Sequence, residues 1–164
     1  MQITNLQLTD KQAIAWYETA TPEVKAILEE TYKNRGGKRF FIQDITKQIK
    51  TFDDILNFVQ LDEDEKFLLN YNGTNKNILS CKYHLKIELI VQVLNNGVEC
   101  DIMNTTECKY YPWFVVGSSG FSFFNFYYQF SFTLVAGRLC FKTEDLAVFA
   151  GQTFELEYND YLSC

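Results

Sequence analysis

Residues 109–141 read KYYPWFVVGSSGFSFFNFYYQFSFTLVAGRLCF, and this stretch decides the fold. Between Phe121 and Phe132, two-thirds of the residues are aromatic. So much aromatic surface must be buried in a core or covered by a partner, because large exposed apolar patches are rare on soluble monomers. From Phe124 to Phe132 an aromatic stands at every second position, and its neighbours on the opposite face are partly aromatic too. The alternation predicts a β-strand with both faces covered.

The flanking residues complete a small sheet. Residues 109–116 predict a preceding strand, in which Pro112 lacks a backbone donor and therefore favours an edge position or a bend. Gly117-Ser-Ser-Gly120 is typical of a hairpin turn, and residues 138–142 predict a third strand. We therefore expect a small antiparallel, aromatic-rich sheet over about residues 109–142.

Two helices are expected to cover this sheet. Residues 75–95 predict a long central helix with two adjacent apolar stripes, which leaves little more than the face of Lys82 and Lys86 for water. Residues 143–161 predict a C-terminal helix, capped by Thr143. The central helix would cover one face of the sheet, and the C-terminal helix or another chain the other. Gly151, which costs about 1 kcal/mol relative to Ala inside a helix, is interpreted as a close contact with the sheet.

The N-terminal part predicts short helices over residues 9–72. Thr9 and Thr51 each precede a Gln or Asp by three residues, as in a capping box. The acidic pairs at Asp53 and in the run 62–65 are interpreted as helix-start residues, since neither brings a third partner for a metal or for acid–base work. Residues 1–8 are a possible N-terminal arm, or else a short strand.

Together these elements predict an α+β fold. The 164 residues are expected to form one domain, with a helical N-terminal part over residues 9–72 and a helix–sheet–helix core over residues 75–164.

Charge and cysteine content limit the function classes. The formal net charge of −6 opposes binding to nucleic acid or to an anionic membrane, and the basic residues around Gly37 are interpreted as a solvated loop. Five cysteines without a CxxC pair, in a chain without a secretory signal, favour synthesis in a reducing cytoplasm. No apolar run reaches the roughly 18 residues that indicate a membrane span.

Candidate chemistry centres on the single histidine, His84. Cys81, one helical turn away, suggests a catalytic dyad, and Cys81, His84, Cys100 and Cys108 suggest a zinc site. The spacing matches no compact zinc motif, and the roles of these four residues stay open. Gly117–Gly120 lacks the pattern of a phosphate-binding loop. We therefore expect no catalytic residue, metal or cofactor.

The aromatic strand itself is the better candidate for a functional surface. Platforms that stack single-stranded nucleic acid carry Lys and Arg between the aromatics, whereas residues 121–137 contain neither. The surplus aromatics instead favour a protein interface, in an oligomer or a larger assembly. The candidate interface residues are Phe123, Phe124, Phe126, Tyr127, Tyr128, Phe130 and Phe132.

Three blocks carry a resemblance to a known family. They are KYYPWF (109–114), GRLCFK (137–142) and EDLAVFAGQTF (144–154), in this order. The chain resembles a family of gut Bacteroidales and their tailed phages, crAss-like phages among them, over roughly residues 86–162. The upstream ITKQIKTFDDIL (45–56) is similar to the family's helix-opening segment. Where family members have LNEGW and PDW, this chain has Leu-Asn-Asn-Gly-Val and Cys-Asp-Ile, and its aromatic strand is richer.

The resemblance implies a phage or phage-derived origin, and it supplies no catalytic residues to carry over. It leads to the hypothesis of a non-enzymatic virion structural protein, such as an auxiliary capsid or head–tail component, made in the bacterial cytoplasm. It would bind other virion proteins or its own copies. The main alternative is a cytoplasmic phage accessory protein that binds a host or replication protein. An enzyme of unrecognised type and a nucleic-acid-binding protein are the lesser alternatives.

Overall fold

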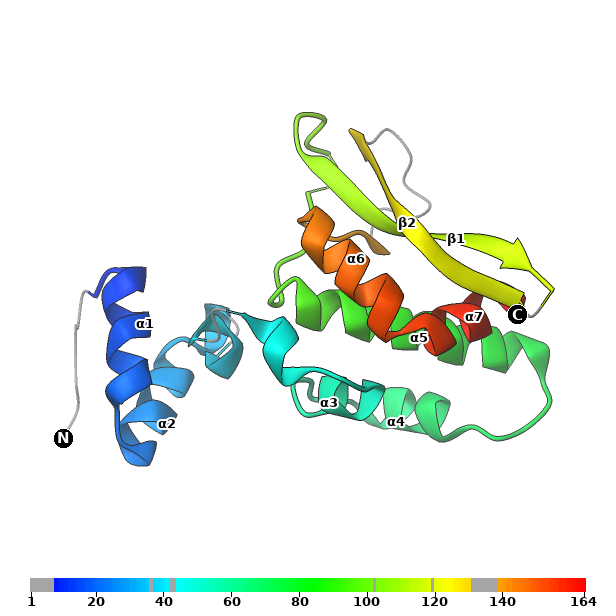
Figure 1. The fold of residues 1–164 in the computed structure, drawn as a ribbon. Helices are drawn as coiled ribbons and strands as arrows, with labels where there is room; N and C mark the ends of the chain where they lie inside the picture. Colours follow the sequence, from blue (N-terminus) through cyan, green and yellow to red (C-terminus); the bar gives the residue numbers. More distant parts are fainter. Residues whose placement is uncertain (1–7, 36, 42–43, 102, 119, 131–138) are drawn as a thin grey trace. The chain divides into compact units, whose positions relative to one another are not determined.

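The computed structural model describes residues 8–35, 37–41, 44–101, 103–118, 120–130 and 139–164 (Figure 1). The chain divides into two compact units, Met1–Ile45 and Thr46–Cys164, and each is described by itself. Helices and one antiparallel β-hairpin make up the described residues, so the predicted α+β class is confirmed. That the whole chain acts as one domain stays a prediction, and the expected N-terminal arm over residues 1–8 lies outside the described residues except for Leu8.

The first unit is a small helical cluster. Helices α1 (Asp10–Thr19) and α2 (Pro22–Thr31) are followed by the 3-10 turns η1 (Lys33–Arg35) and η2 (Gly37–Phe41). Thr9 and Gln12 form the predicted capping box at the start of α1. Ala13, Leu28 and Phe41 are buried in its core, and the ring of Tyr17 stacks on Phe41 with centroids 4.3 Å apart.

The second unit begins with short helices. After η3 (Ile45–Gln48), which crosses the boundary between the units, come α3 (Phe52–Leu56) and α4 (Glu63–Asn70). Capping boxes join Thr51 to Asp54 and Asp62 to Glu65, so the interpretation of these acidic residues as helix-start residues is confirmed. Each carboxylate accepts backbone N–H groups that the first helical turn leaves without partners.

The long helix α5 (Lys76–Leu94) occupies nearly the predicted range. Its C-terminal half, from Leu85 onward, is mostly buried, whereas Ser80 and Cys81 near its start are exposed. The prediction that Lys82 and Lys86 form the water-facing side is wrong. Lys82 Nζ donates to the Tyr71 carbonyl at 2.8 Å, and Lys86 Nζ lies 5.0 Å from the centre of the Phe52 ring, because α3 and the end of α4 lie along that side.

The sheet is a twisted two-stranded hairpin. Strand β1 (Cys108–Gly117) pairs with β2 (Gly120–Phe130), and a bulge between Trp113 and Phe114 leaves Phe124 without a partner on β1. The third strand predicted over 138–142 does not form in its described residues, which make only one bridge, between Tyr110 and Phe141. Its backbone turns away because the Lys142 N–H donates to Asn95 Oδ1 at 3.1 Å and α6 starts soon after.

The predicted C-terminal helix is two helices, α6 (Glu144–Thr153) and α7 (Glu155–Ser163). Thr143 caps α6 as expected, by accepting the Leu146 N–H. The break falls at Phe154, whose side chain is fully buried and whose backbone is not helical, with φ −112° and ψ 30°. A helix bent at this point keeps both halves in contact with the unit's core.

Helices α6 and α7 are the principal cover of the hairpin, and α5 packs against α7, α6, α4 and α3 (Figure 1). The order of layers is therefore hairpin, α6 with α7, α5, and then α3 with α4. We expected the long helix to cover one face of the sheet and the C-terminal helix or another chain to cover the other. This expectation is wrong, because α6 and α7 lie between α5 and the hairpin. The apolar stripes of α5 are instead buried between two layers of helices.

Gly151 in α6 is the close contact with the sheet that the sequence indicated. A Cβ placed on it would lie 2.2 Å from Cδ2 of Phe123 and 3.0 Å from Cβ of Pro112. Only glycine lets the helix backbone approach the strands this closely. The face of the hairpin that carries Phe123 and Pro112 is therefore its inner face.

Candidate functional site

The strand register sorts the aromatic residues between two faces. Residues paired across an antiparallel ladder share a face, and successive residues alternate. Pro112 pairs with Phe126, and Phe114 with Phe123, so these four lie on the inner face. The Phe114 ring lies 4.9 Å from that of Tyr158 in α7. Tyr111 pairs with Tyr127, and Trp113 with Asn125, on the opposite face.

The outer face carries an exposed aromatic pair. The rings of Trp113 and Tyr127 are 5.7 Å apart, and their side chains are 52% and 51% exposed. Val115 is exposed on the same face, and Phe124 at the bulge is 68% exposed. We call Trp113, Val115 and Tyr127 the outer patch. Large apolar side chains that gather in this way on a sheet are typical of contact surfaces.

A second aromatic row lies on the inner face, near the C-terminal end of β2. The Tyr110 ring is 6.1 Å from Phe126 and 6.2 Å from Tyr128, and Tyr128 is 6.5 Å from Phe130. Tyr128 and Phe130 are about half exposed. Cover from the helices is therefore greater at Phe123 and Phe126, which are half-buried, than at Tyr128 and Phe130.

The seven predicted interface residues do not form one surface. Phe123 lies under α6, and Phe126, Tyr128 and Phe130 share the inner-face row. Tyr127 belongs to the outer patch, Phe124 is exposed at the bulge, and Phe132 lies outside the described residues. That these residues bind a partner stays a prediction. Sequence reasoning missed Trp113, although its position opposite the aromatic strand was the available signal.

The candidate catalytic and zinc residues are separated. His84 Nε2 lies 3.4 Å from Glu88 Oε1, and its ring is 5.8 Å from that of Tyr161. Cys81 is exposed beside it, while Cys108 begins β1 and Cys100 lies beyond the end of α5. In the described part of the chain, no three His, Cys, Asp or Glu side chains are placed to hold a metal ion.

A groove runs along α5 past His84 and Glu88. It has a volume of about 430 Å³, and acidic residues from the start of α4 line its other wall. These are Asp62, Asp64 and Glu65. The imidazole beside Glu88 thus lies within an acidic surface.

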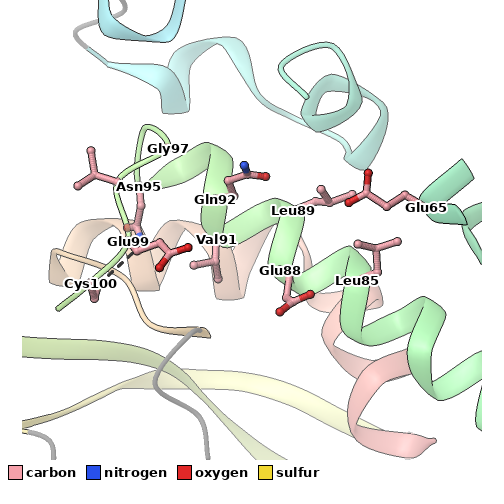
Figure 2. Close-up of a pocket in the computed structure, with 11 residues that line it drawn as sticks. Glu65, Leu85, Glu88, Leu89, Val91, Gln92, Asn95, Gly97, Glu99 and Cys100 are labelled. Carbon is pink, nitrogen blue, oxygen red and sulfur yellow. Dashed lines mark hydrogen bonds between the residues drawn. The ribbon is translucent and has the colours of Figure 1, made fainter. Parts of the chain in front are cut away.

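A second groove, of about 350 Å³, follows the other half of α5 and ends at Cys100 (Figure 2). Its lining combines apolar helix residues with acidic side chains. They are Glu65, Leu85, Glu88, Leu89, Val91, Gln92, Asn95, Gly97, Val98, Glu99 and Cys100.

Asn95, at the C-terminal cap of α5, ties three chain segments together. Its Nδ2 donates to the Cys140 carbonyl at 2.8 Å, and its Oδ1 accepts the Lys142 N–H at 3.1 Å. Its side chain is buried, so both hydrogen bonds lie away from water. The Cys100 thiol donates to the same Cys140 carbonyl at 3.5 Å. The segment after α5 is in this way held against the segment before α6.

A buried lysine lies beside this cluster. Lys109 at the start of β1 is 0% exposed, and its ammonium donates to the carbonyls of Asn104 at 2.6 Å and Glu107 at 3.0 Å. The Glu107 carboxylate, 3.7 Å away, supplies the opposite charge. A buried ammonium requires such partners, so Lys109 fixes the turn between residues 104 and 107.

No helix in the described residues is both long and apolar enough to cross a membrane. Comparison with protein-family models, curated proteins and solved structures finds no match for this chain.

Proposed function

We propose that this protein is a non-enzymatic structural protein of a phage particle, an auxiliary capsid or head–tail component, and that the outer patch binds neighbouring subunits. The observation that carries the proposal is the half-exposed pair of Trp113 and Tyr127 on the sheet face opposite α6. Trp and Tyr are the residues most often found at the energetic centre of protein interfaces. The phage origin rests on the sequence resemblance.

The charge distribution favours a protein partner over nucleic acid. The net charge is −6, and β2 contains neither Lys nor Arg. The grooves along α5 are lined by carboxylates, which repel phosphate.

Mass spectrometry of purified virions tests the phage assignment. We expect this chain at a stoichiometric copy number relative to the major capsid protein. Recovery of the chain only in the soluble fraction of infected cells, with a host or replication protein, would support the accessory-protein alternative and contradict the virion role.

Paired substitutions test the surface. Trp113→Ser with Tyr127→Ser should lower incorporation into particles at least tenfold, because an interface centre is worth several kcal/mol. Leu156→Ser, at an apolar side chain 77% exposed in α7, is the matched control and should leave incorporation unchanged. Equal incorporation of both variants, with circular dichroism showing both folded, would contradict the role of the outer patch.

A further inference from the structure

Two thiols from distant parts of the chain meet at the end of the second groove. Cys100 follows α5, and Cys140 precedes α6, forty positions later in the sequence. The Cys100 thiol donates to the Cys140 carbonyl at 3.5 Å, and this contact brings the two side chains close together. Asn95 holds both segments, since its Nδ2 lies 2.8 Å from that carbonyl and 3.9 Å from Cys100 Sγ.

The two sulfur atoms differ in access. Cys140 is 1% exposed, whereas Cys100 is half-buried and lines the groove (Figure 2). A small molecule that enters the groove therefore reaches Cys100 first. Cys140 itself is closed to solvent.

The surroundings also distinguish the two thiols. The thiol of Cys140, donating a hydrogen bond, lowers the pKa of Cys100, and Lys142 and Lys109 act in the same direction against burial and the Glu107 carboxylate. The same hydrogen bond, with burial, raises the pKa of Cys140. The accessible cysteine thus forms the nucleophilic thiolate more readily, and its neighbour keeps its proton.

We propose that Cys100 and Cys140 are a dithiol–disulfide site, in which Cys100 reacts with a peroxide and Cys140 resolves the product. The Cys100 thiolate attacks one peroxide oxygen, the O–O bond breaks, and the leaving hydroxide takes up a proton to form water. The resulting sulfenic acid is attacked by the sulfur of Cys140, whose proton leaves with the hydroxyl group as a second water. Two thiols and one hydrogen peroxide give one disulfide and two waters.

The disulfide has a defined structural effect. It closes the chain between residues 100 and 140, and this loop contains the whole hairpin. A cross-link over about 40 residues restricts the unfolded chain and should raise the melting temperature of Thr46–Cys164 by roughly 10 °C. The outer patch would then sit on a hairpin that is more resistant to opening.

Peptide mapping of the full chain tests the proposal. Reduced protein is treated with an equimolar amount of hydrogen peroxide, quenched with N-ethylmaleimide and digested with trypsin. We expect residues 139–142 to be joined to residues 87–109, with the loss of two hydrogens. Since residues 87–109 also contain Cys108, further cleavage before Asp101 identifies the sulfur that is bonded.

Matched variants sharpen the result. Cys108→Ser should keep the cross-link and the rise in melting temperature, whereas Cys100→Ser and Cys140→Ser should lose both. If a variant fails to fold, the mapping of the wild-type chain still decides. Recovery of residues 139–142 with an alkylated thiol, while Cys100 carries a sulfinic acid or a bond to another cysteine, would overturn the proposal.

Discussion

The ring of Phe123 lies directly against the backbone of Gly151. A methyl group on Gly151 would come within 2.2 Å of Cδ2 and 2.3 Å of Cε2 of this ring. The contact joins the first half of β2 to the last turn of α6, and it sets the distance between the hairpin and the helices. Because glycine is the only residue without a Cβ, this distance depends on a single position.

Gly151→Ala should destabilise the protein although alanine is the better helix former. The gain in helix propensity is about 1 kcal/mol, whereas overpacking of a well-filled contact typically costs about 1–3 kcal/mol. Urea unfolding should therefore show a lower midpoint. Combining Gly151→Ala with Phe123→Leu should recover part of the lost stability. Gln152→Ala, at an exposed position of the same helix, is the control, and an equal effect there would contradict the steric explanation.

Asn95→Ala should lower the free energy of unfolding by about 2–3 kcal/mol, because the buried Cys140 carbonyl and the Lys142 N–H each lose a hydrogen-bond partner. Asn95→Asp keeps an acceptor for Lys142 but places a second acceptor against the Cys140 carbonyl, so it should also destabilise. Chemical denaturation measures both changes. Gln92→Ala, at an exposed position on α5, should change the midpoint little.

Tyr158→Phe should reduce the loss of stability at alkaline pH. Burial, with a smaller contribution from Tyr161, raises the pKa of the Tyr158 phenol, whose hydroxyl is buried without a hydrogen-bond partner among the described residues. Because the pKa of the phenol is raised in the folded state, the stability that the neutral Tyr158 contributes is fully present below pH 10, the ordinary pKa of tyrosine. This stability is lost above pH 10, where the phenol ionises in the unfolded chain.

For this variant, thermal unfolding between pH 8 and 11.5 is the measurement. Removing an unpaired hydroxyl should leave stability at pH 7 unchanged or raise it by about 1 kcal/mol. Tyr83 and Tyr111, whose pKa values are also raised, retain part of the alkaline dependence in the variant. A slope as steep as that of the wild type would contradict the prediction.

Asp54→Asn should weaken the start of α3 at neutral pH. Backbone N–H groups of Lys50 and Thr51, with the Thr51 hydroxyl, donate to the Asp54 carboxylate and lower its pKa below the usual 3.8. Such a group contributes stability that is present above that value and is lost as the pH falls through its folded pKa. The stability difference between wild type and variant should therefore shrink on acidification. Asp53→Asn changes the same charge one position earlier and should have the smaller effect at pH 7.

Local signals in the sequence predicted the elements well. Thr9, Thr51 and Thr143 each begin a helix as expected, because a hydroxyl that accepts a backbone N–H acts within four residues. The hairpin turn at Gly117–Gly120 and the close contact at Gly151 depend on similarly local requirements of backbone and space.

Features that depend on tertiary contacts could not be predicted from local sequence patterns. The segment at Phe141 has the composition of a strand, but Asn95 takes the Lys142 N–H and ends the pairing after one bridge. The apolar stripe from Leu146 to Tyr161 fits one straight helix, whereas burial of Phe154 bends it. A side chain forty-seven positions away leaves no trace in a local period.

The candidate sites show the same division. Alternation in β2 identified its aromatics, but the faces on which they lie depend on the register with β1, so Trp113 was missed and Phe123 was misplaced. Asn95, Cys100 and Cys140 carry no shared spacing, and nothing in their neighbours signals that they meet. A lysine at the start of a strand is expected to face solvent, yet Lys109 is buried and its ammonium donates to carbonyls of the 104–107 turn.

The bulge at Phe124 makes the length of β2 as informative as its composition. The strand uses eleven residues where β1 uses ten, so Phe121 and Phe123, at odd positions, share the inner face with Phe126, Tyr128 and Phe130. Loss of Phe124 alone would convert the bulge to regular pairing and keep both groups on the inner face, whereas loss of Phe124 and Asn125 together would send one of the two groups to the opposite face. Parity in the residue count, more than the choice between Phe and Tyr, determines which rings meet the helices and which remain available to a neighbour.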